Sequence, residues 1–146
     1  MAWIKTIAYE AATGRLRKLY DRVKGPDDNV DNIMLAHSLR PHSMEGHMTL
    51  YKYVLHHSAN RLPKWLLEAV GVYVSLINRC GYCVEHHYQG LSRLLGDAER
   101  ATAMRKALES RRLSNAFEPQ QVAILDYARQ LTEAPAGMSE ATIQGL

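Results

Sequence analysis

The sequence predicts an all-α protein. Apolar residues recur at helical spacing along the chain, whereas the alternation of apolar and polar residues that is typical of strands is nearly absent. The chain has 146 residues, about the length of one domain, and it contains no repeat, low-complexity tract or linker. We therefore expect a single all-helical domain over residues 1–146.

Three helices are predicted in the first part of the chain, at about residues 10–24, 33–39 and 42–57. The first carries apolar residues at the i, i+3, i+4 and i+7 positions of one face: Leu16, Leu19, Tyr20 and Val23. Gly25-Pro26 ends this helix, and Asp31 or Asn32 caps the next. One side of the third helix is apolar and is expected to lie in the core: Met44, Met48, Tyr51 and Leu55.

The fourth predicted helix, KWLLEAVGVYVSLIN at residues 64–78, is apolar on almost every side and follows Pro63, which suits a first turn. A helix with this pattern is buried in a core or an interface. Further helices are predicted at residues 82–95, 97–110 and 118–133. A last helix begins after Ser139, close to the end of the sequence, so we expect a shortened chain or a tail that docks on a neighbouring subunit.

Composition and charge argue against several classes of protein. Hydrophobic residues make up 47% and charged residues 23%, which is typical of a globular protein rather than a disordered one. The net charge is only +3 and the basic residues are scattered, so a nucleic-acid surface is not expected. The N-terminus lacks the apolar core of a signal peptide, and no segment approaches membrane-spanning length. We therefore expect a cytoplasmic protein without a membrane partner.

Both cysteines lie in one short segment, RCGYCVEHHYQG at residues 79–90. Cys80 and Cys83 are three residues apart, and His87 follows Cys83 by four, so Cys83 and His87 share one helical face. In a reducing cytosol, a lone pair of closely spaced cysteines is more often catalytic or metal-binding than structural. The segment is therefore the candidate functional site.

Glu68 lies in the most apolar helix, where an acidic side chain needs a partner. If the chain reverses near residues 78–81, the two flanking helices run antiparallel. Glu68 is eleven residues before Arg79 and His87 is eight after it, so both lie roughly 12–17 Å from the turn. Gly71 would allow a close approach of the helices. We therefore expect Glu68 to contact His87.

This arrangement predicts an activated thiol. The carboxylate of Glu68 orients the imidazole of His87, and the imidazole takes the proton of Cys83. The N-terminus of the helix also favours the thiolate. Attack on a peroxide gives a sulfenic acid, and Cys80 lies within disulfide reach of it.

Other interpretations remain open at this point. The two cysteines could simply pack, or they could report oxidation in a non-catalytic redox sensor. Zinc could be bound by Cys80, Cys83 and His87, with Glu68 or His86 as a fourth ligand, although the sequence has no second CxxC pair. Glu68 could instead pair with Lys64, one turn earlier. The remaining histidines are expected to be ordinary polar residues: His37, His42, His47, His56 and His57.

The spacing of Glu68, Cys80-Gly81-Tyr82-Cys83 and His87 resembles that of the alkyl hydroperoxidase D-like (AhpD-like) family of the carboxymuconolactone decarboxylase superfamily. The stretches YEAATGRLRKLYD, NRCGYCVEHH and ILDYARQLTEAP resemble its peroxidase-related branch. Tyr82 stands where the family often has a histidine.

The resemblance implies an AhpD-like helical bundle that forms homo-oligomers. It implies that Cys83 attacks the peroxide, that Cys80 resolves the intermediate, that His87 is the base and that Glu68 orients it. The implied partners are a hydroperoxide substrate and an external dithiol or redox-protein reductant. No flavin, haem or nucleotide motif is visible, so neither a cofactor nor a metal is expected.

Overall fold

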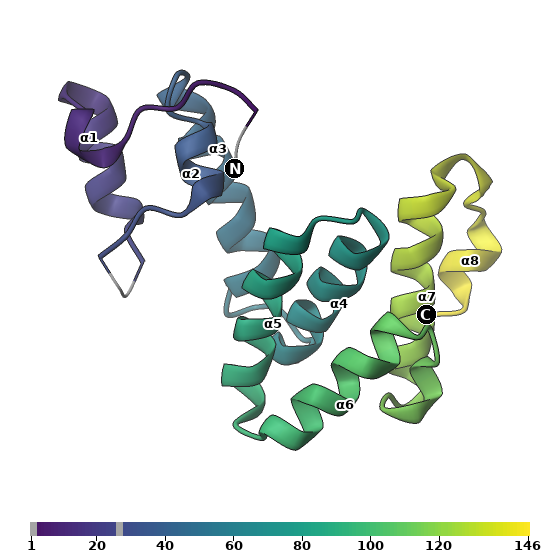
Figure 1. Ribbon diagram of the computed structural model, residues 1–146. Coiled ribbons are helices and arrows are strands. Elements are labelled where there is room, and N and C mark those ends of the chain that lie inside the picture. The colour runs from purple at the N-terminus through teal and green to yellow at the C-terminus, as the bar shows by residue number, and fades with distance from the viewer. Residues whose placement is uncertain (1–2, 26–27) are drawn as a thin grey trace. The chain divides into compact units, whose positions relative to one another are not determined.

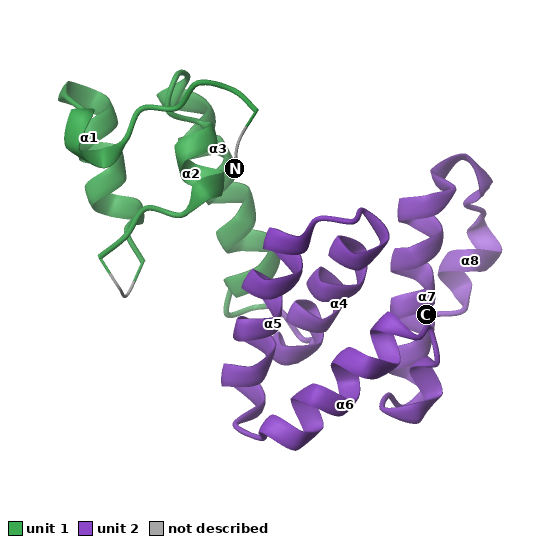
Figure 2. Ribbon diagram, in the orientation of Figure 1, with its two compact units in different colours: residues 1–59 green, residues 60–146 purple. Residues whose placement is uncertain are grey.

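The computed structural model describes residues 3–25 and 28–146. These residues form eight α-helices and no strand, which confirms the predicted all-α class (Figure 1). The chain divides into two compact units, residues 1–59 and 60–146 (Figure 2). The expectation of a single domain over the whole chain stays a prediction. Within the described ranges, no helix combines the length and apolarity needed to cross a bilayer.

The first unit contains α1 (Gly14–Val23), α2 (Asn32–Ala36) and α3 (Pro41–Tyr51). Its core consists of buried apolar side chains from these helices and the segment before them: Ala12, Leu16, Leu19, Tyr20, Met34 and Met44. The hydroxyl of Tyr20 donates a hydrogen bond of 2.7 Å to the carbonyl oxygen of Ile7, which ties the N-terminal segment to this core.

All three helices of the first unit differ from their predicted extent, and α2 ends at Ala36 rather than at residue 39. The helix predicted at residues 10–24 begins at Gly14, because a separate 3-10 turn occupies Tyr9–Ala11. The helix predicted at residues 42–57 is α-helical only to Tyr51 and continues as a π-helical turn at Lys52–His56. Apolar spacing does not distinguish these tighter and wider turns from α-helix.

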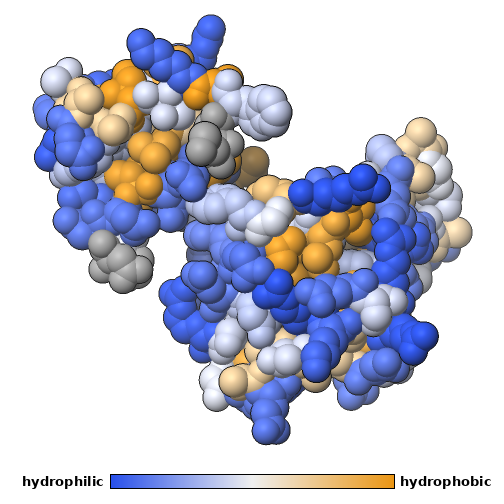
Figure 3. All heavy atoms as spheres, in the orientation of Figure 1, coloured by the Kyte–Doolittle hydropathy of each residue, from blue (hydrophilic) through white to orange (hydrophobic). Residues whose placement is uncertain are grey.

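The second unit is built around α4 (Lys64–Ile77), which packs against α5 (Gly81–Leu95), α6 (Ala98–Glu109) and α7 (Pro119–Glu133). The last helix is α8 (Glu140–Gln144). Buried residues of α4 to α7 form one core, which includes Ala69, Val72, Leu91, Met104 and Leu125. In Figure 3, hydrophobic side chains of this unit gather over α4 and hydrophilic ones surround them. Contacts with three helices explain why α4 is apolar on nearly every side.

Arginines in the left-handed conformation end two of these helices. Arg79 follows α4 with φ 56°, and its backbone N–H and that of Cys80 donate to the carbonyl oxygens of Leu76 and Ser75. Arg111 follows α6 with the same φ and the corresponding pair of bonds, from Arg111 to Leu108 and from Arg112 to Ala107. This is the Schellman pattern, in which glycine is the usual left-handed residue.

We expect Arg79→Gly to stabilise the protein. A left-handed conformation costs a residue with a Cβ atom roughly 1–2 kcal/mol, and glycine avoids this cost. Glycine also makes the unfolded chain more flexible, which favours the unfolded state by about 0.5–1 kcal/mol. The free energy of unfolding in urea should therefore rise by about 0.5–1 kcal/mol.

Arg93→Gly is the matched control, because Arg93 is an exposed residue inside α5. Glycine there should lower the free energy of unfolding by about 1 kcal/mol. A loss of stability in both variants would contradict the role assigned to the left-handed Arg79.

Candidate functional site

The antiparallel pair α4 and α5 brings Glu68 and His87 into contact. Oε2 of Glu68 lies 2.8 Å from Nδ1 of His87. Glu68 is only 9% exposed, and His87 is partly buried. The predicted contact is therefore present, and His87 is the hydrogen-bonding partner of the buried carboxylate rather than Lys64. Because Nδ1 faces the carboxylate, Nε2 is the ring nitrogen that remains for proton transfer.

Two glycines make this contact possible. A Cβ atom on Gly71 of α4 would lie 2.5 Å from Nδ1 of His87, and a Cβ atom on Gly90 of α5 would lie 2.7 Å from Cδ of Glu68. Both distances are shorter than carbon atoms tolerate. Gly71 therefore lies opposite His87, and Gly90 lies opposite Glu68. In each helix the glycine follows the polar residue by three positions. The close approach at Gly71 was predicted from the sequence, whereas that at Gly90 was not.

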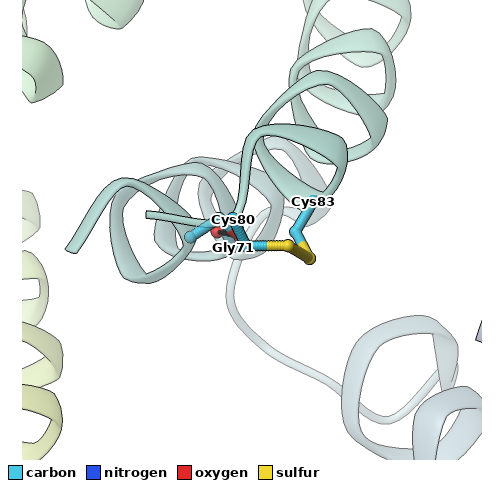
Figure 4. Close-up of a disulfide and its surroundings, with 4 residues drawn as sticks. Gly71, Cys80 and Cys83 are labelled. Carbon is cyan, nitrogen blue, oxygen red and sulfur yellow. Dashed lines mark hydrogen bonds between the residues drawn. A yellow bond between two sulfur atoms is a disulfide. The ribbon is translucent and has the colours of Figure 1, made fainter. Parts of the chain in front are cut away.

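Cys80 and Cys83 form a disulfide at the start of α5 (Figure 4). Cys80 occupies the N-cap position, and Cys83 is the third residue of the helix. Their Cα atoms are 5.3 Å apart, which is typical of a disulfide. The predicted disulfide reach is therefore present, and in this state neither sulfur is a free thiolate.

Ser75 anchors the segment that carries the cysteines. This buried residue accepts the backbone N–H of Cys80 on its carbonyl oxygen at 3.0 Å. Its hydroxyl donates to the carbonyl oxygen of Gly71 at 2.6 Å. Ser75 thus links the start of the cysteine motif to the close-approach position of α4. Ser75 was not predicted as part of the site, because a single serine in an apolar helix has no characteristic spacing.

The outer side of the motif is open. Gly81 is exposed with open space beside it, and Tyr82 is 43% exposed. The ring of Tyr82 stacks on that of His86 with centroids 6.0 Å apart, and His86 meets His87 edge to face at the same distance. A reductant or a substrate could reach the disulfide past Gly81.

Charges beside the site are paired on its surface. Glu85 of α5 accepts hydrogen bonds from Arg105 of α6 at 2.6 and 3.2 Å. These hydrogen bonds from Arg105 lower the pKa of the Glu85 carboxyl below its ordinary value. Glu85 is therefore an ionised surface residue, whereas Glu68 is the carboxylate within the helix pair.

Across the residues that the structure describes, no group of three or more histidine, cysteine and acidic side chains is arranged to hold a metal ion.

Two histidines of the first unit contact each other: the rings of His37 and His47 lie 5.1 Å apart. The sequence predicts only that both are ordinary polar residues. Pro41 begins α3, and the chain turns there and brings the two rings together.

Comparisons with known proteins show which proteins share this fold. No protein-family model matches the sequence, and no curated protein matches it. A solved structure of an uncharacterized peroxidase-related protein from Ralstonia eutropha JMP134, described as an alkylhydroperoxidase AhpD core, has a TM-score of 0.80 and 22% identity. That match covers 98% of this chain and 73% of the other.

A second solved structure, an uncharacterized peroxidase-related protein from Silicibacter sp. TM1040, has a TM-score of 0.75 and 23% identity, and the match covers 99% of this chain and 76% of that one. The chain thus has the helical fold of AhpD-core and peroxidase-related proteins. The resemblance found in the sequence is confirmed at the level of the fold.

We expect Gly71→Ala to weaken the α4–α5 pair. The added methyl group would displace the ring of His87, and the buried carboxylate of Glu68 would lose its partner. Overpacking and loss of this hydrogen bond should together lower the free energy of unfolding by roughly 1–3 kcal/mol, measured in urea.

Gly81→Ala is the control for this experiment, since open space surrounds Gly81. Its free energy of unfolding should be unchanged or up to about 1 kcal/mol higher. Equal stability of Gly71→Ala and the wild type would show that the close approach at Gly71 is not needed.

Proposed function

We propose that the protein is a thiol-dependent hydroperoxide reductase. The observation that carries the proposal is the juxtaposition on one helical hairpin of a CxxC disulfide and a buried carboxylate–imidazole pair. Two sulfurs that already form a bond are suited to a cycle between dithiol and disulfide. The descriptions of the two structural neighbours as peroxidase-related add support to this class of reaction.

In the first step, the thiolate of Cys83 attacks the terminal oxygen of a hydroperoxide, ROOH. The S–O bond forms as the O–O bond breaks, so Cys83 becomes a sulfenic acid and RO⁻ leaves. His87 takes the thiol proton on Nε2 and returns it to RO⁻, which gives the alcohol ROH. The position of Cys83 in the first turn of α5 favours its thiolate.

In the second step, the thiol of Cys80 condenses with the sulfenic acid of Cys83 and releases water. The disulfide that forms is the state described above. An external dithiol then reduces it through a mixed disulfide. The sum of these steps is ROOH plus a dithiol, giving ROH, water and the oxidised form of that dithiol.

Glu68 would act on the sulfurs through His87. Its carboxylate accepts the Nδ1 proton of the imidazole, which fixes the tautomer with a free Nε2 and stabilises the imidazolium when that nitrogen is protonated. In this scheme Glu68 and His87 form a proton relay, with Glu68 as its inner end. Cytoplasmic location and homo-oligomeric assembly belong to the same proposal and stay predictions.

The two cysteines should differ in their mutant behaviour. Cys83→Ser should abolish peroxide consumption in a steady-state assay with dithiothreitol, because the attacking sulfur is absent. Cys80→Ser should retain one attack per molecule, and a sulfenic-acid reagent should detect the trapped product. Equal residual turnover in both variants would remove the assignment of roles.

The same assay separates the alternatives. A redox sensor would be oxidised by peroxide once but would not turn over with the dithiol. A zinc protein would release metal to a chelator and lose stability.

Glu68→Gln should slow the reaction while keeping the shape of the side chain. His87 remains in this variant but loses the carboxylate that fixes its tautomer and stabilises the imidazolium. A general acid–base group contributes about 10²–10⁴-fold in rate, so kcat/KM for the peroxide should fall by about 100-fold. Glu85→Gln is the control on α5, because this exposed carboxylate pairs with Arg105, and it should change kcat/KM by less than about twofold. A similar loss in both variants would show that general surface charge, rather than the relay, governs the rate.

A further inference from the structure

A hollow lies in the unit of residues 60–146, and neither cysteine lines it. It occupies about 590 Å³ between α4, α7 and the segment at residues 111–115. This volume is in the range of small-molecule sites in proteins. Arg111, Arg112 and Arg129 line it together with Asp126, so the lining carries more positive than negative charge.

Two of the guanidinium groups are held in place by carboxylates. Glu133 accepts hydrogen bonds from Arg111 at 2.9 Å and from Arg129 at 3.2 Å, and Arg129 also pairs with Asp126 at 3.3 Å. A guanidinium group has five N–H donors, so both arginines keep donors for a ligand. Groups that are already ordered lose little entropy on binding.

Arg112 supplies the remaining positive charge. Its side chain is exposed at the hollow, beside the ordered Arg111. The three arginines carry three positive charges, and Asp126 and Glu133 carry two negative charges, so these five side chains have a net charge of +1. A single negative charge would balance it.

Part of the lining of the hollow is apolar and includes a tyrosine. Tyr73 of α4 is 2% exposed and lines the hollow. Four charged groups act on its phenol: Arg111, Arg129, Asp126 and Glu133. Burial is the largest cause and raises the pKa of the Tyr73 phenol above its ordinary value, while the arginines lower it and the carboxylates raise it. The hydroxyl therefore stays protonated and can donate a hydrogen bond. Leu113 and Val122 add apolar surface beside it.

The turn that ends α6 places Arg111 at the hollow. Its left-handed φ of 56° belongs to the same kind of turn that ends α4 at Arg79. Because this turn brings Arg111 and Arg112 one after the other to the lining, two guanidinium groups face the same hollow.

From these features we infer that the hollow binds a small organic monoanion, a carboxylate attached to an apolar body. The carboxylate would lie between Arg112 and the free donors of Arg111, and the apolar body would contact Tyr73, Leu113 and Val122. Glu68 and Tyr73 are five residues apart on α4, roughly 140° around the helix. The ligand would therefore lie on the side of α4 away from the Glu68–His87 pair, and its binding does not depend on the proposed peroxide chemistry.

The experiment measures binding of benzoate to the whole chain by isothermal titration calorimetry, with benzamide and acetate as matched probes. Benzamide has the ring without the charge, and acetate has the charge without the ring. Benzoate should bind at least about tenfold more tightly than either. Equal binding of benzamide would overturn the role of the charge, and equal binding of acetate would overturn the role of the apolar lining.

Three variants locate the site. Arg112→Gln and Arg111→Gly should each weaken benzoate binding by about tenfold or more, and Arg93→Gln, an exposed position on α5, should leave it unchanged. Arg111→Gly also relieves the left-handed backbone, so its melting temperature should not fall. Lost binding in this folded variant therefore supports the site, and unchanged binding in Arg111→Gly and Arg112→Gln overturns it. Neither result bears on peroxide turnover, which is measured separately.

Discussion

The buried carboxylate of Glu68 sets the geometry of the second unit. A charge in an apolar helix is costly unless it is hydrogen-bonded, and His87 provides that bond. For Nδ1 to reach the carboxylate, α4 and α5 must approach so closely that neither Gly71 nor Gly90 has room for a Cβ atom. The close helix pair in turn fixes the connection between the helices and holds the cysteines at the start of α5.

Much of this arrangement was predictable because helices have a fixed rise per residue. Once the turn near Arg79 was inferred, the depths of Glu68 and His87 followed from counting. The predicted ranges 64–78 and 82–95 also lie close to the observed α4 and α5. Gly90 was missed because counting gives depth along a helix, whereas its role depends on how α5 is rotated towards Glu68. The pairing of His37 and His47 was missed because it depends on the angle of the chain at Pro41.

Two polar residues of α4 point to different sides of the helix. Glu68 faces α5, whereas Tyr73 reaches the hollow beside α7. In a helix that contacts three others, every polar group needs a neighbour that can satisfy it, so each one indicates a polar feature of the adjoining helix. Ser75 is the exception, because its hydroxyl donates to the carbonyl oxygen of Gly71 in its own helix, and its backbone carbonyl accepts the N–H of Cys80.

Each of the two left-handed arginines lies next to one of the proposed sites. Arg79 lies directly before Cys80, and Arg111 lines the hollow between α4 and α7. In each case the Schellman turn reverses the chain within two residues, which brings the next segment back against α4 or α7 without a longer loop. A longer and looser connection would leave Cys80 free to move relative to Cys83, and disulfide formation would then cost more conformational entropy. The tight turn therefore stabilises the helix end and holds the first sulfur near the second.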